Sequence, residues 1–389
     1  MTDFPSTVDL AIVGGGVVGL ALARLLARAG EEVLVLDEGR HGGTNANAGS
    51  LHVQMQSRFI RLYPEQVPAL ERALPLYVAA ARVWASLEQE LGADFELKRS
   101  GGLMIAENRA QYEFLARKCD RERALGLDVE MVGRADLLRL APYLDPDAVY
   151  GAELCADEGK LNPLLANAAL TRGATAAGAR LVGETRVVRL AEGGSGFLVE
   201  TSRGTARAAR VVLAAGAGTG ALAAQLGVTI PTKAEPLHMN VTEPMAPVVR
   251  HLVQHAERMI TLKQLASGHV VVGGGWPARL AGEGTPRVER ASILGNLALA
   301  ARLAPGIAQA RVIRTWAGVN TTCDGASIIG AVGPRGLFVA VPGDAGYTLG
   351  PLVARLAAQA IRGERPDFDL APFDPGRFAA GAAADPLPA

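Results

Sequence analysis

The feature that most constrains the fold is a glycine-rich turn between an apolar run and an apolar helix-forming stretch. Asp9–Val13 has the composition of a buried strand, and Gly14-Gly15-Gly16-Val17-Val18-Gly19 follows it directly. Val17–Ala29 then predicts a helix that ends at Gly30, and Val33–Leu36 predicts a second buried strand. A strand, a glycine turn, a helix and a strand in this order predict one βαβ crossover unit.

The spacing of the glycines predicts that this turn binds a dinucleotide. Gly14 permits the tight turn, Gly16 lets the backbone approach a pyrophosphate, and Gly19 lets the helix lie close to the sheet. Asp37 ends the second strand, where a carboxylate accepts hydrogen bonds from ribose hydroxyls. The pattern fits FAD or NAD and disfavours NADP. The residues expected to contact the dinucleotide here are Gly14, Gly16, Val17, Val18, Gly19, Asp37 and Glu38.

The rest of the chain alternates between helical and strand patterns. Helices are expected over residues 64–91, 109–125, 136–140, 163–180, 287–303 and 349–362. Strands are expected over residues 187–190, 197–201, 210–215, 237–242, 259–264, 269–273 and 337–341.

This order predicts an α/β (α+β) protein with two interleaved domains. The expected Rossmann-like cofactor-binding domain comprises residues 1–90, 146–232 and 318–370. The expected substrate-binding domain, a mainly antiparallel sheet, comprises residues 91–145 and 233–317. Residues 371–389 are expected to form a C-terminal tail.

Composition excludes several other classes of protein. The formal net charge is zero and no basic tract is present, which argues against nucleic-acid binding. Cys119, Cys155 and Cys323 stand far apart, so we expect no disulfide framework and no metal site. The apolar stretch Leu10–Ala27 is interrupted by glycines, and Met1–Thr7 lacks the features of a signal peptide. We therefore expect a cytoplasmic protein.

Several motifs outside the βαβ unit resemble one family of flavoproteins. A small, polar loop, His41–Ser50, follows the second strand, and Gly343–Gly350 lies between the last strand and the last helix. With the N-terminal turn, these segments resemble the D-amino acid oxidase family, which includes glycine oxidase, sarcosine oxidase and D-amino acid dehydrogenase. Further markers of the resemblance are Asn47-Ala48-Gly49, Ala214-Ala215-Gly216, Trp316-Ala317-Gly318, Asp324-Gly325 and Ile329-Gly330.

The resemblance implies FAD as the cofactor. The last helix would direct its N-terminus at the pyrimidine side of the flavin, where negative charge develops on reduction. Some sarcosine oxidases attach the flavin through a cysteine, but this chain has Ala317 at the similar position, so non-covalent FAD is expected. Further implied contacts are Thr44, Asn45, Asn47, Ala48, Gly49, Ser50, Val187, Ala215, Gly216, Gly343, Asp344, Ala345, Gly346, Tyr347 and Thr348.

The resemblance also implies a reaction. A hydride would pass from the carbon next to an amine nitrogen to flavin N5, and an imine would form. Glu158–Pro163 and Asn47–Gln54 look most like the β subunits of opine oxidase, hydrogen cyanide synthase and hydroxyproline dehydrogenase. Because such proteins often function beside small partner subunits, the resemblance implies that this chain could have them too. Two alternatives stay open: a flavin-carrying subunit that is inactive alone, and an NAD-dependent dehydrogenase. The sequence leaves the exact substrate, the electron acceptor, any membrane association through it, and the oligomeric state undecided.

An amino acid or imino acid substrate needs a cation for its carboxylate. Glycine oxidase places an arginine shortly after Trp-x-Gly, whereas this chain has Asn320. Arg58 and Arg61 resemble the Arg-x-x-Arg of sarcosine oxidases and are the expected replacement, against the alternative of solvated surface arginines.

Three further side chains are candidates for the substrate site. They are His52, Lys263 and Tyr347. For Lys263 the favoured alternative is simple exposure on a strand, and for His52 it is a structural histidine. Trp276 is expected in the core.

Overall fold

The computed structural model describes residues 4–39 and 42–379. His41 of the predicted loop and residues 380–389 of the predicted tail lie outside them. The chain divides into two compact units, each of which is described by itself. The first unit comprises Met1–Asn45, Asn167–Glu235 and Asn320–Ala389, and the second comprises Ala46–Ala166 and Pro236–Val319.

The first unit is built on a mainly parallel sheet with the strand order β19-β20-β11-β1-β2-β8. β1 pairs in parallel with β2 and with β11, so the predicted βαβ crossover is confirmed. The strands predicted over residues 187–190 and 197–201 are present as β9 and β10, which pair with each other, and β10 also pairs with β11. The strands are β1 (Thr7–Val13), β2 (Val33–Leu36), β8 (Arg180–Val182), β9 (Val187–Gly193), β10 (Gly196–Thr201), β11 (Gly204–Leu213), β19 (Ile328–Ala331) and β20 (Leu337–Val341).

Two apolar helices pack together in this unit because glycines let them approach. They are α1 (Val17–Arg28) and α9 (Gly346–Ile361). A Cβ on Gly19 would overlap the carbonyl oxygen of Gly14, and a Cβ on Gly350 would lie 2.6 Å from Cγ1 of Val17. The unit also contains α7 (Thr219–Ala224) and, from Asn167 onward, α6 (Pro163–Ala176). Gly350 therefore lets the N-terminal parts of α1 and α9 come close to each other, and Gly19 lets α1 lie close to the turn at Gly14.

The second unit is built on a mainly antiparallel sheet with the order β18-β12-β15-β14-β13-β4-β6-β5. β4 (Gly102–Ala106) and β13 (Leu252–His255) form its one parallel pair among those whose register is described. The other strands are β5 (Val129–Gly133), β6 (Gly151–Cys155), β12 (Lys233–Pro244), β14 (Thr261–Gln264), β15 (His269–Gly273) and β18 (Val312–Thr322). A small separate pair joins β3 (Ser50–Leu51) to β7 (Gly159–Lys160).

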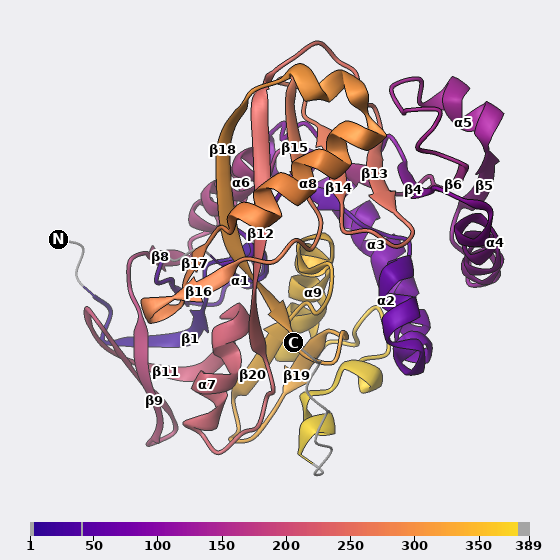
Figure 1. Cartoon of the computed structure of the whole chain (residues 1–389). Coiled ribbons are helices and arrows are strands. Elements are labelled where there is room, and N and C mark those ends of the chain that lie inside the picture. The colour runs from indigo at the N-terminus through magenta and orange to yellow at the C-terminus, as the bar shows by residue number, and fades with distance from the viewer. Residues whose placement is uncertain (1–3, 40–41, 380–389) are drawn as a thin grey trace. The chain divides into compact units, whose positions relative to one another are not determined.

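The two faces of this sheet differ in polarity. α8 (Arg290–Leu303) lies across the strands (Figure 1) and packs Leu299 and Leu303 against Leu262 and Val270. Because side chains alternate along a strand, Lys263 projects from the opposite face. That face also meets α4 (Arg109–Ala124), and the unit further contains α2 (Ser57–Leu62), α3 (Val67–Leu91) and α5 (Arg134–Leu140).

Several sequence-based boundaries differ from the structure. The helix predicted over residues 163–180 ends at Ala176, because Gly178 adopts a φ of 101° and Arg180 begins β8. The strands β4, β5, β6 and β13 were not predicted. Residues 46–90 and 146–166, which the sequence analysis placed with the cofactor-binding segments, belong to the second compact unit. Which unit binds the substrate stays a prediction.

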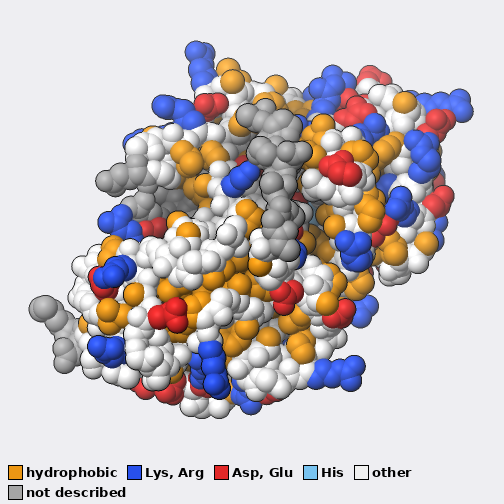
Figure 2. All heavy atoms as spheres, turned by 90° about the horizontal axis from the view of Figure 1, so that it is seen from below, with side chains coloured by type: hydrophobic (Ala, Val, Ile, Leu, Met, Phe, Trp, Pro, Cys, Tyr) orange, Lys and Arg blue, Asp and Glu red, His pale blue; other side chains and the backbone are white. Residues whose placement is uncertain are grey.

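The surface agrees with the balanced composition. On the face shown in Figure 2, Lys and Arg side chains are interspersed with Asp and Glu side chains. That face therefore lacks the continuous basic area typical of nucleic-acid-binding proteins. Among the described residues, no helix is both long and apolar enough to cross a membrane.

The contact between α1 and α9 gives a first prediction. Gly350→Val places a branched side chain against Val17, whose Cγ1 lies 2.6 Å from the site of the new Cβ. Overpacking of this kind destabilises a fold by about 1 to 3 kcal/mol. Urea unfolding measures the change. Gly306→Val is the control, because a Cβ there meets nothing within 4 Å. Equal stability of the two variants would contradict the described packing.

Candidate functional site

The glycine turn after β1 has the geometry that a dinucleotide requires. Gly14 has a φ of 112°, and a Cβ on it would overlap the carbonyl oxygen of Ala214. The end of β11, with Ala215 and Gly216 after it, therefore lies against this turn. The backbone N–H of Val17 donates to Oγ1 of Thr44 at 2.9 Å. α1 begins at Val17, and its N-cap residue, Gly16, has no side chain to cap the helix. Apart from the N–H of Val17, which donates to Thr44, the first N–H groups of this helix can bind an anion.

Asp37 lies at the edge of this turn. Its side chain packs against Gly15, where a Cβ would overlap Oδ2, and its Oδ1 accepts a hydrogen bond from the N–H of Gly39 at 2.7 Å. A carboxylate beside the glycine turn suits a ribose hydroxyl pair. Glu38 follows it on the surface, and Val187 lies at the start of β9.

The loop between β20 and α9 is also closely packed. Ala345 adopts the left-handed conformation with a φ of 49°, and α9 begins at the next residue. Desolvation and the carboxylates of Glu235 and Asp324 raise the pKa of Asp344 to about 7. Tyr347 is buried, and its hydroxyl donates to Oδ1 of Asn167 at 2.9 Å.

Asn167 connects Tyr347 to the first loop of the same unit. Its Nδ2 donates to the carbonyl oxygen of Thr44 at 3.1 Å. The hydroxyl of Tyr347 is therefore linked through Asn167 to the loop that contains Thr44. This contact was not part of the expectation that Tyr347 contacts the flavin or the substrate.

In the second unit, Asn47–Ser50 forms a tight turn that leads into β3. Gly49 has a φ of 76° and donates its N–H to Oδ1 of Asn47 at 2.7 Å. A Cβ on Gly49 would overlap the carbonyl oxygen of Leu161, so glycine is required here on two counts. The indole Nε1 of Trp316 donates to the carbonyl oxygen of Ala46 at 2.8 Å and holds the start of the segment.

Lys263 lies within the second unit and is fully buried. Its Nζ donates to Oγ of Ser50 at 2.7 Å, and no carboxylate among the described residues pairs with it. Burial and the neighbouring ammonium of Lys160 lower its pKa to about 7. The expectation that Lys263 is an exposed strand residue is therefore wrong, because its side chain projects from the buried polar face of the sheet, opposite the apolar face that packs against α8.

His52 accompanies this lysine. Removal from water and the positive charge of Lys263 lower the pKa of His52 to about 4, while a hydrogen bond with Gln254 opposes the shift. Its imidazole is neutral at pH 7. Lys160, opposite Ser50 in the β3–β7 pair, donates to the carbonyl oxygen of Arg250 at 2.6 Å, and burial lowers its pKa to about 8.

A buried carboxylate holds the segment that carries His52. Oε1 of Glu158 accepts hydrogen bonds from the N–H groups of Val53 at 2.8 Å and Gln54 at 3.2 Å. Its Oε2 accepts from Nε2 of Gln54 at 2.9 Å and of Gln254 at 2.7 Å. Gly102 makes room for this side chain, since a Cβ there would overlap Oε2. Burial raises the pKa of Glu158 to about 7 although four donors favour its ionised form.

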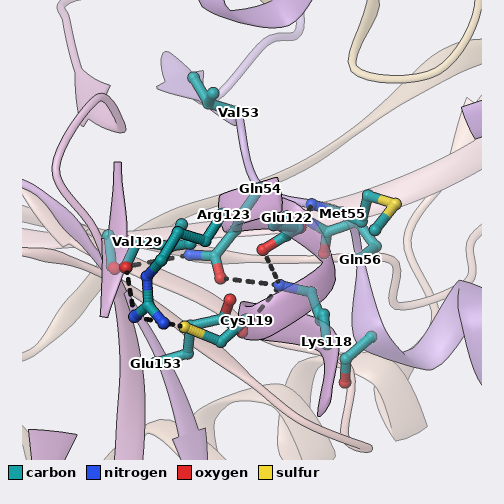
Figure 3. A network of polar contacts seen from close by, with 12 residues as sticks. Val53, Gln54, Met55, Gln56, Lys118, Cys119, Glu122, Arg123, Val129 and Glu153 are labelled. Atoms are coloured by element: carbon teal, nitrogen blue, oxygen red, sulfur yellow. Dashed lines mark hydrogen bonds and ion pairs between the residues drawn. The ribbon is translucent and has the colours of Figure 1, made fainter. Parts of the chain in front are cut away.

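A second cluster continues from Gln54 into α4 and β6 (Figure 3). Nζ of Lys118 donates to Oε2 of Glu122 and to Oε2 of Glu153, both at 2.8 Å, and to Oε1 of Gln54 at 3.3 Å. Oε1 of Glu122 accepts from the N–H of Met55 at 2.6 Å. Burial raises the pKa of Glu153, so the cluster of one ammonium and two carboxyls retains a proton.

The two candidate arginines lie elsewhere in this unit. Arg61 pairs with Glu257 at 3.1 Å and stacks on the ring of Phe114 at 3.7 Å. Arg58 lines a groove of about 420 Å³ formed by the β13–β14 turn and α8, the helix on the apolar face of the sheet. Trp276 lines the same groove and is only partly buried, so its placement in the core is wrong.

The comparisons with known proteins agree with this geometry. Residues 9–360 match the family described as DAO, FAD dependent oxidoreductase. The chain belongs to this family of FAD-dependent oxidoreductases. FAD is its cofactor, and an NAD-dependent dehydrogenase is not supported. The close-fitting glycines at 14, 16 and 19 provide the room that a dinucleotide needs.

Individual DAO-family proteins resemble the chain over nearly its whole length. A glycine oxidase from Geobacillus kaustophilus (strain HTA426) is 29% identical over 371 residues, which cover 94% of this chain and 96% of that protein. A subunit of opine oxidase from Rhizobium meliloti is 27% identical, covering 95% of this chain and 98% of that protein. The crystal structure of the Geobacillus kaustophilus glycine oxidase superposes with a TM-score of 0.83 at 26% identity, covering 95% of this chain and 98% of that one.

The sequence analysis missed most of the polar side chains on the face of the sheet from which Lys263 projects. Gln54, Glu158 and Lys160 were noted only within segments that mark a resemblance, and Lys118 and Gln254 were not noted. One signal was present, because Gln254 directly follows the apolar pair Leu252-Val253 and Lys263 directly follows Leu262. A polar residue at such a position is either paired or functional.

Burial of Lys263 predicts a specific pH dependence of stability. The pKa of its ammonium falls from 10.5 to about 7 on folding. Between these values the unfolded chain binds the proton and the folded chain does not, so the free energy of unfolding rises with pH. Relative to Lys263→Met, the free energy of unfolding of the wild-type protein should rise by about 1.4 kcal/mol per pH unit over this window. Urea midpoints at several pH values measure the difference.

The control is Lys98→Met, because Lys98 is exposed in the same unit. Its difference from wild type should not vary with pH. A pH-independent difference for Lys263→Met as well would show that the lysine is not buried in the folded protein.

Proposed function

We propose that the protein oxidises the C–N bond of an amino acid or N-substituted amino acid. The observation that carries the proposal is Lys263, a buried ammonium that has no carboxylate partner among the described residues. A buried cation is costly unless a negative charge accompanies it. A substrate carboxylate is the kind of group that would compensate this one.

The redox chemistry belongs to the cofactor. When bound, FAD would accept a hydride, with its two electrons, from the carbon next to a neutral amine nitrogen, and the substrate would become a protonated imine. The names of two relatives, a glycine oxidase and a subunit of opine oxidase, support a nitrogen-bearing substrate for this chain as well.

The protein's own residues would bind and orient the substrate. Lys263 would pair with the carboxylate, and Ser50 fixes the direction of its Nζ at 2.7 Å. The neutral ring of His52 can accept a hydrogen bond from an amine N–H, because its lowered pKa keeps it unprotonated at pH 7. In this proposal Arg58 and Arg61 are not the carboxylate anchor, since Arg61 already pairs with Glu257 and Arg58 lines the groove beside α8.

The cofactor contacts are proposed on the same footing. The N-terminal part of α1 would bind the pyrophosphate, Asp37 the ribose, and the loop before α9 the flavin. The supporting observations are the start of α1 at an N-cap glycine, the carboxylate beside Gly15 and the left-handed Ala345 ahead of α9.

A second candidate is that the chain is the flavin-carrying subunit of a larger enzyme. Its support is that one relative, aligned over 98% of its length, is named as a subunit of opine oxidase. The isolated chain would then bind FAD but turn over slowly without a small partner. Comparison of activity with an artificial dye, with and without a candidate partner, separates the two proposals.

The first experiment is an absorption spectrum of the purified protein followed by anaerobic addition of amines. The panel comprises sarcosine, glycine, D-alanine, D-proline, cis-4-hydroxy-D-proline, octopine and nopaline. We expect flavin bands that one panel member bleaches, because cofactor-borne hydride transfer reduces the ring. A flavin spectrum that no member changes would oppose amine oxidation. Addition of oxygen or of a dye after bleaching then identifies the electron acceptor.

A second experiment identifies the carboxylate anchor. Lys263→Met should raise the substrate concentration for half-maximal flavin reduction roughly 10- to 100-fold, the range expected for one charged hydrogen bond. Arg58→Met is measured beside it, and Lys98→Met is the exposed-lysine control. If this concentration rose more in Arg58→Met than in Lys263→Met, the result would identify Arg58 as the carboxylate anchor. An analogue without the carboxylate should bind both lysine variants equally.

A further inference from the structure

The C-terminal segment of the first unit is packed into the fold rather than detached from it. Phe373 is buried, and a Cβ on Gly330 would lie 3.2 Å from Cδ of Pro375. Two short 3₁₀ turns, Ala371–Phe373 and Pro375–Phe378, carry these contacts. At least the described part of the predicted tail therefore belongs to this unit.

Arg377 makes the most extensive polar contacts in this segment. Its Nε donates to Oδ2 of Asp324 at 2.8 Å and its Nη2 to Oδ1 at 3.0 Å. Nη2 also donates to the carbonyl oxygen of Ser327 at 3.1 Å, and Nη1 to that of Asp374 at 3.1 Å. The guanidinium lies 4.3 Å from the ring centroid of Phe378. A bidentate, partly buried pair of this kind fixes both position and direction.

The loop held by Arg377 packs on the loop that precedes α9. The N–H of Asp344 donates to the carbonyl oxygen of Gly325 at 3.2 Å, and Oγ of Ser327 donates to that of Pro342 at 2.8 Å. A Cβ on Gly343 would lie 2.7 Å from the carbonyl carbon of Ala326. Residues 324–327 are therefore in contact with the C-terminal segment on one side and with Pro342–Asp344 on the other.

Charge is the second contribution of this arginine. Glu235, Asp324 and Asp344 lie close enough to influence one another. Arg377 compensates Asp324, and Nδ2 of Asn320 donates to Oε2 of Glu235 at 3.0 Å. Without the arginine, negative charge would accumulate beside the start of α9, where an anionic cofactor or a reduced flavin would meet repulsion.

We propose that Arg377 is a positioning residue for FAD binding. It fixes residues 324–327 and, through them, Gly343 and Asp344, and it neutralises Asp324. The inference rests on the proposed contact of Gly343–Thr348 with FAD, and it does not depend on the identity of the substrate.

Titration of the apoprotein with FAD tests this inference, because bound flavin changes fluorescence irrespective of turnover. Arg377→Met should raise the Kd for FAD at least 10-fold. Arg377→Lys keeps the charge but loses the bidentate pair, so its Kd should lie between those of wild type and Arg377→Met. Asp324→Asn should also weaken binding, and combining it with Arg377→Met should add little further loss.

Arg355→Met is the matched control, because Arg355 pairs with Asp367 at 3.0 Å in an exposed bridge of α9. Thermal unfolding of each apoprotein shows whether a change in Kd accompanies a change in stability. A wild-type Kd in Arg377→Met, or a Kd that rises equally in Arg355→Met, overturns the inference. Wild-type protein that binds no FAD overturns the inference and the cofactor assignment together. Wild-type protein that binds FAD but is reduced by no amine contradicts the proposed function alone and leaves the Kd comparison valid.

Discussion

The arrangement of the candidate substrate site depends on the burial of charge on one face of the second sheet. An isolated buried charge is unfavourable by several kcal/mol, so each must be compensated by an opposite charge or by hydrogen bonds. Lys118 achieves this with Glu122 and Glu153, and Glu158 achieves it with four N–H donors. Lys263 is the exception, because its one hydrogen bond described here is to a neutral hydroxyl. Glu158 and Glu122 hold residues 53–55 in place, and Lys263 donates to Ser50 in the strand just before them.

The parts of the fold that could be predicted are those governed by local chemistry. The roles of Gly14 and Gly19 could be predicted from the sequence, because a tight turn and a close helix contact leave no room for a Cβ. The strands β1 and β2 are continuous apolar runs, as parallel strands buried on both faces must be. The family resemblance added FAD, which the glycine pattern alone could not separate from NAD, and the match over residues 9–360 confirms it.

The parts that could not be predicted depend on contacts between distant segments. Gln54 meets Glu158, about a hundred positions later in the chain, and neither residue has a local pattern that identifies its partner. Lys263 looks like an ordinary strand lysine until the register of β14 and the position of α8 show which face it occupies. Arg58 and Arg61 share one short helix, yet one lines a groove and the other forms an ion pair. Spacing in sequence indicated that they could act together, but it carried no information about their neighbours.

The fit between Gly102 and Glu158 has a consequence for how this family member can change over time. The glycine contributes no chemistry, yet any side chain at that position would occupy the space of the carboxylate. A larger residue at position 102 is therefore tolerated only together with a change at position 158. The residues at two positions more than fifty residues apart thus constrain each other. Relatives with a larger residue in place of Gly102 would have to anchor the segment after β3 by a different group.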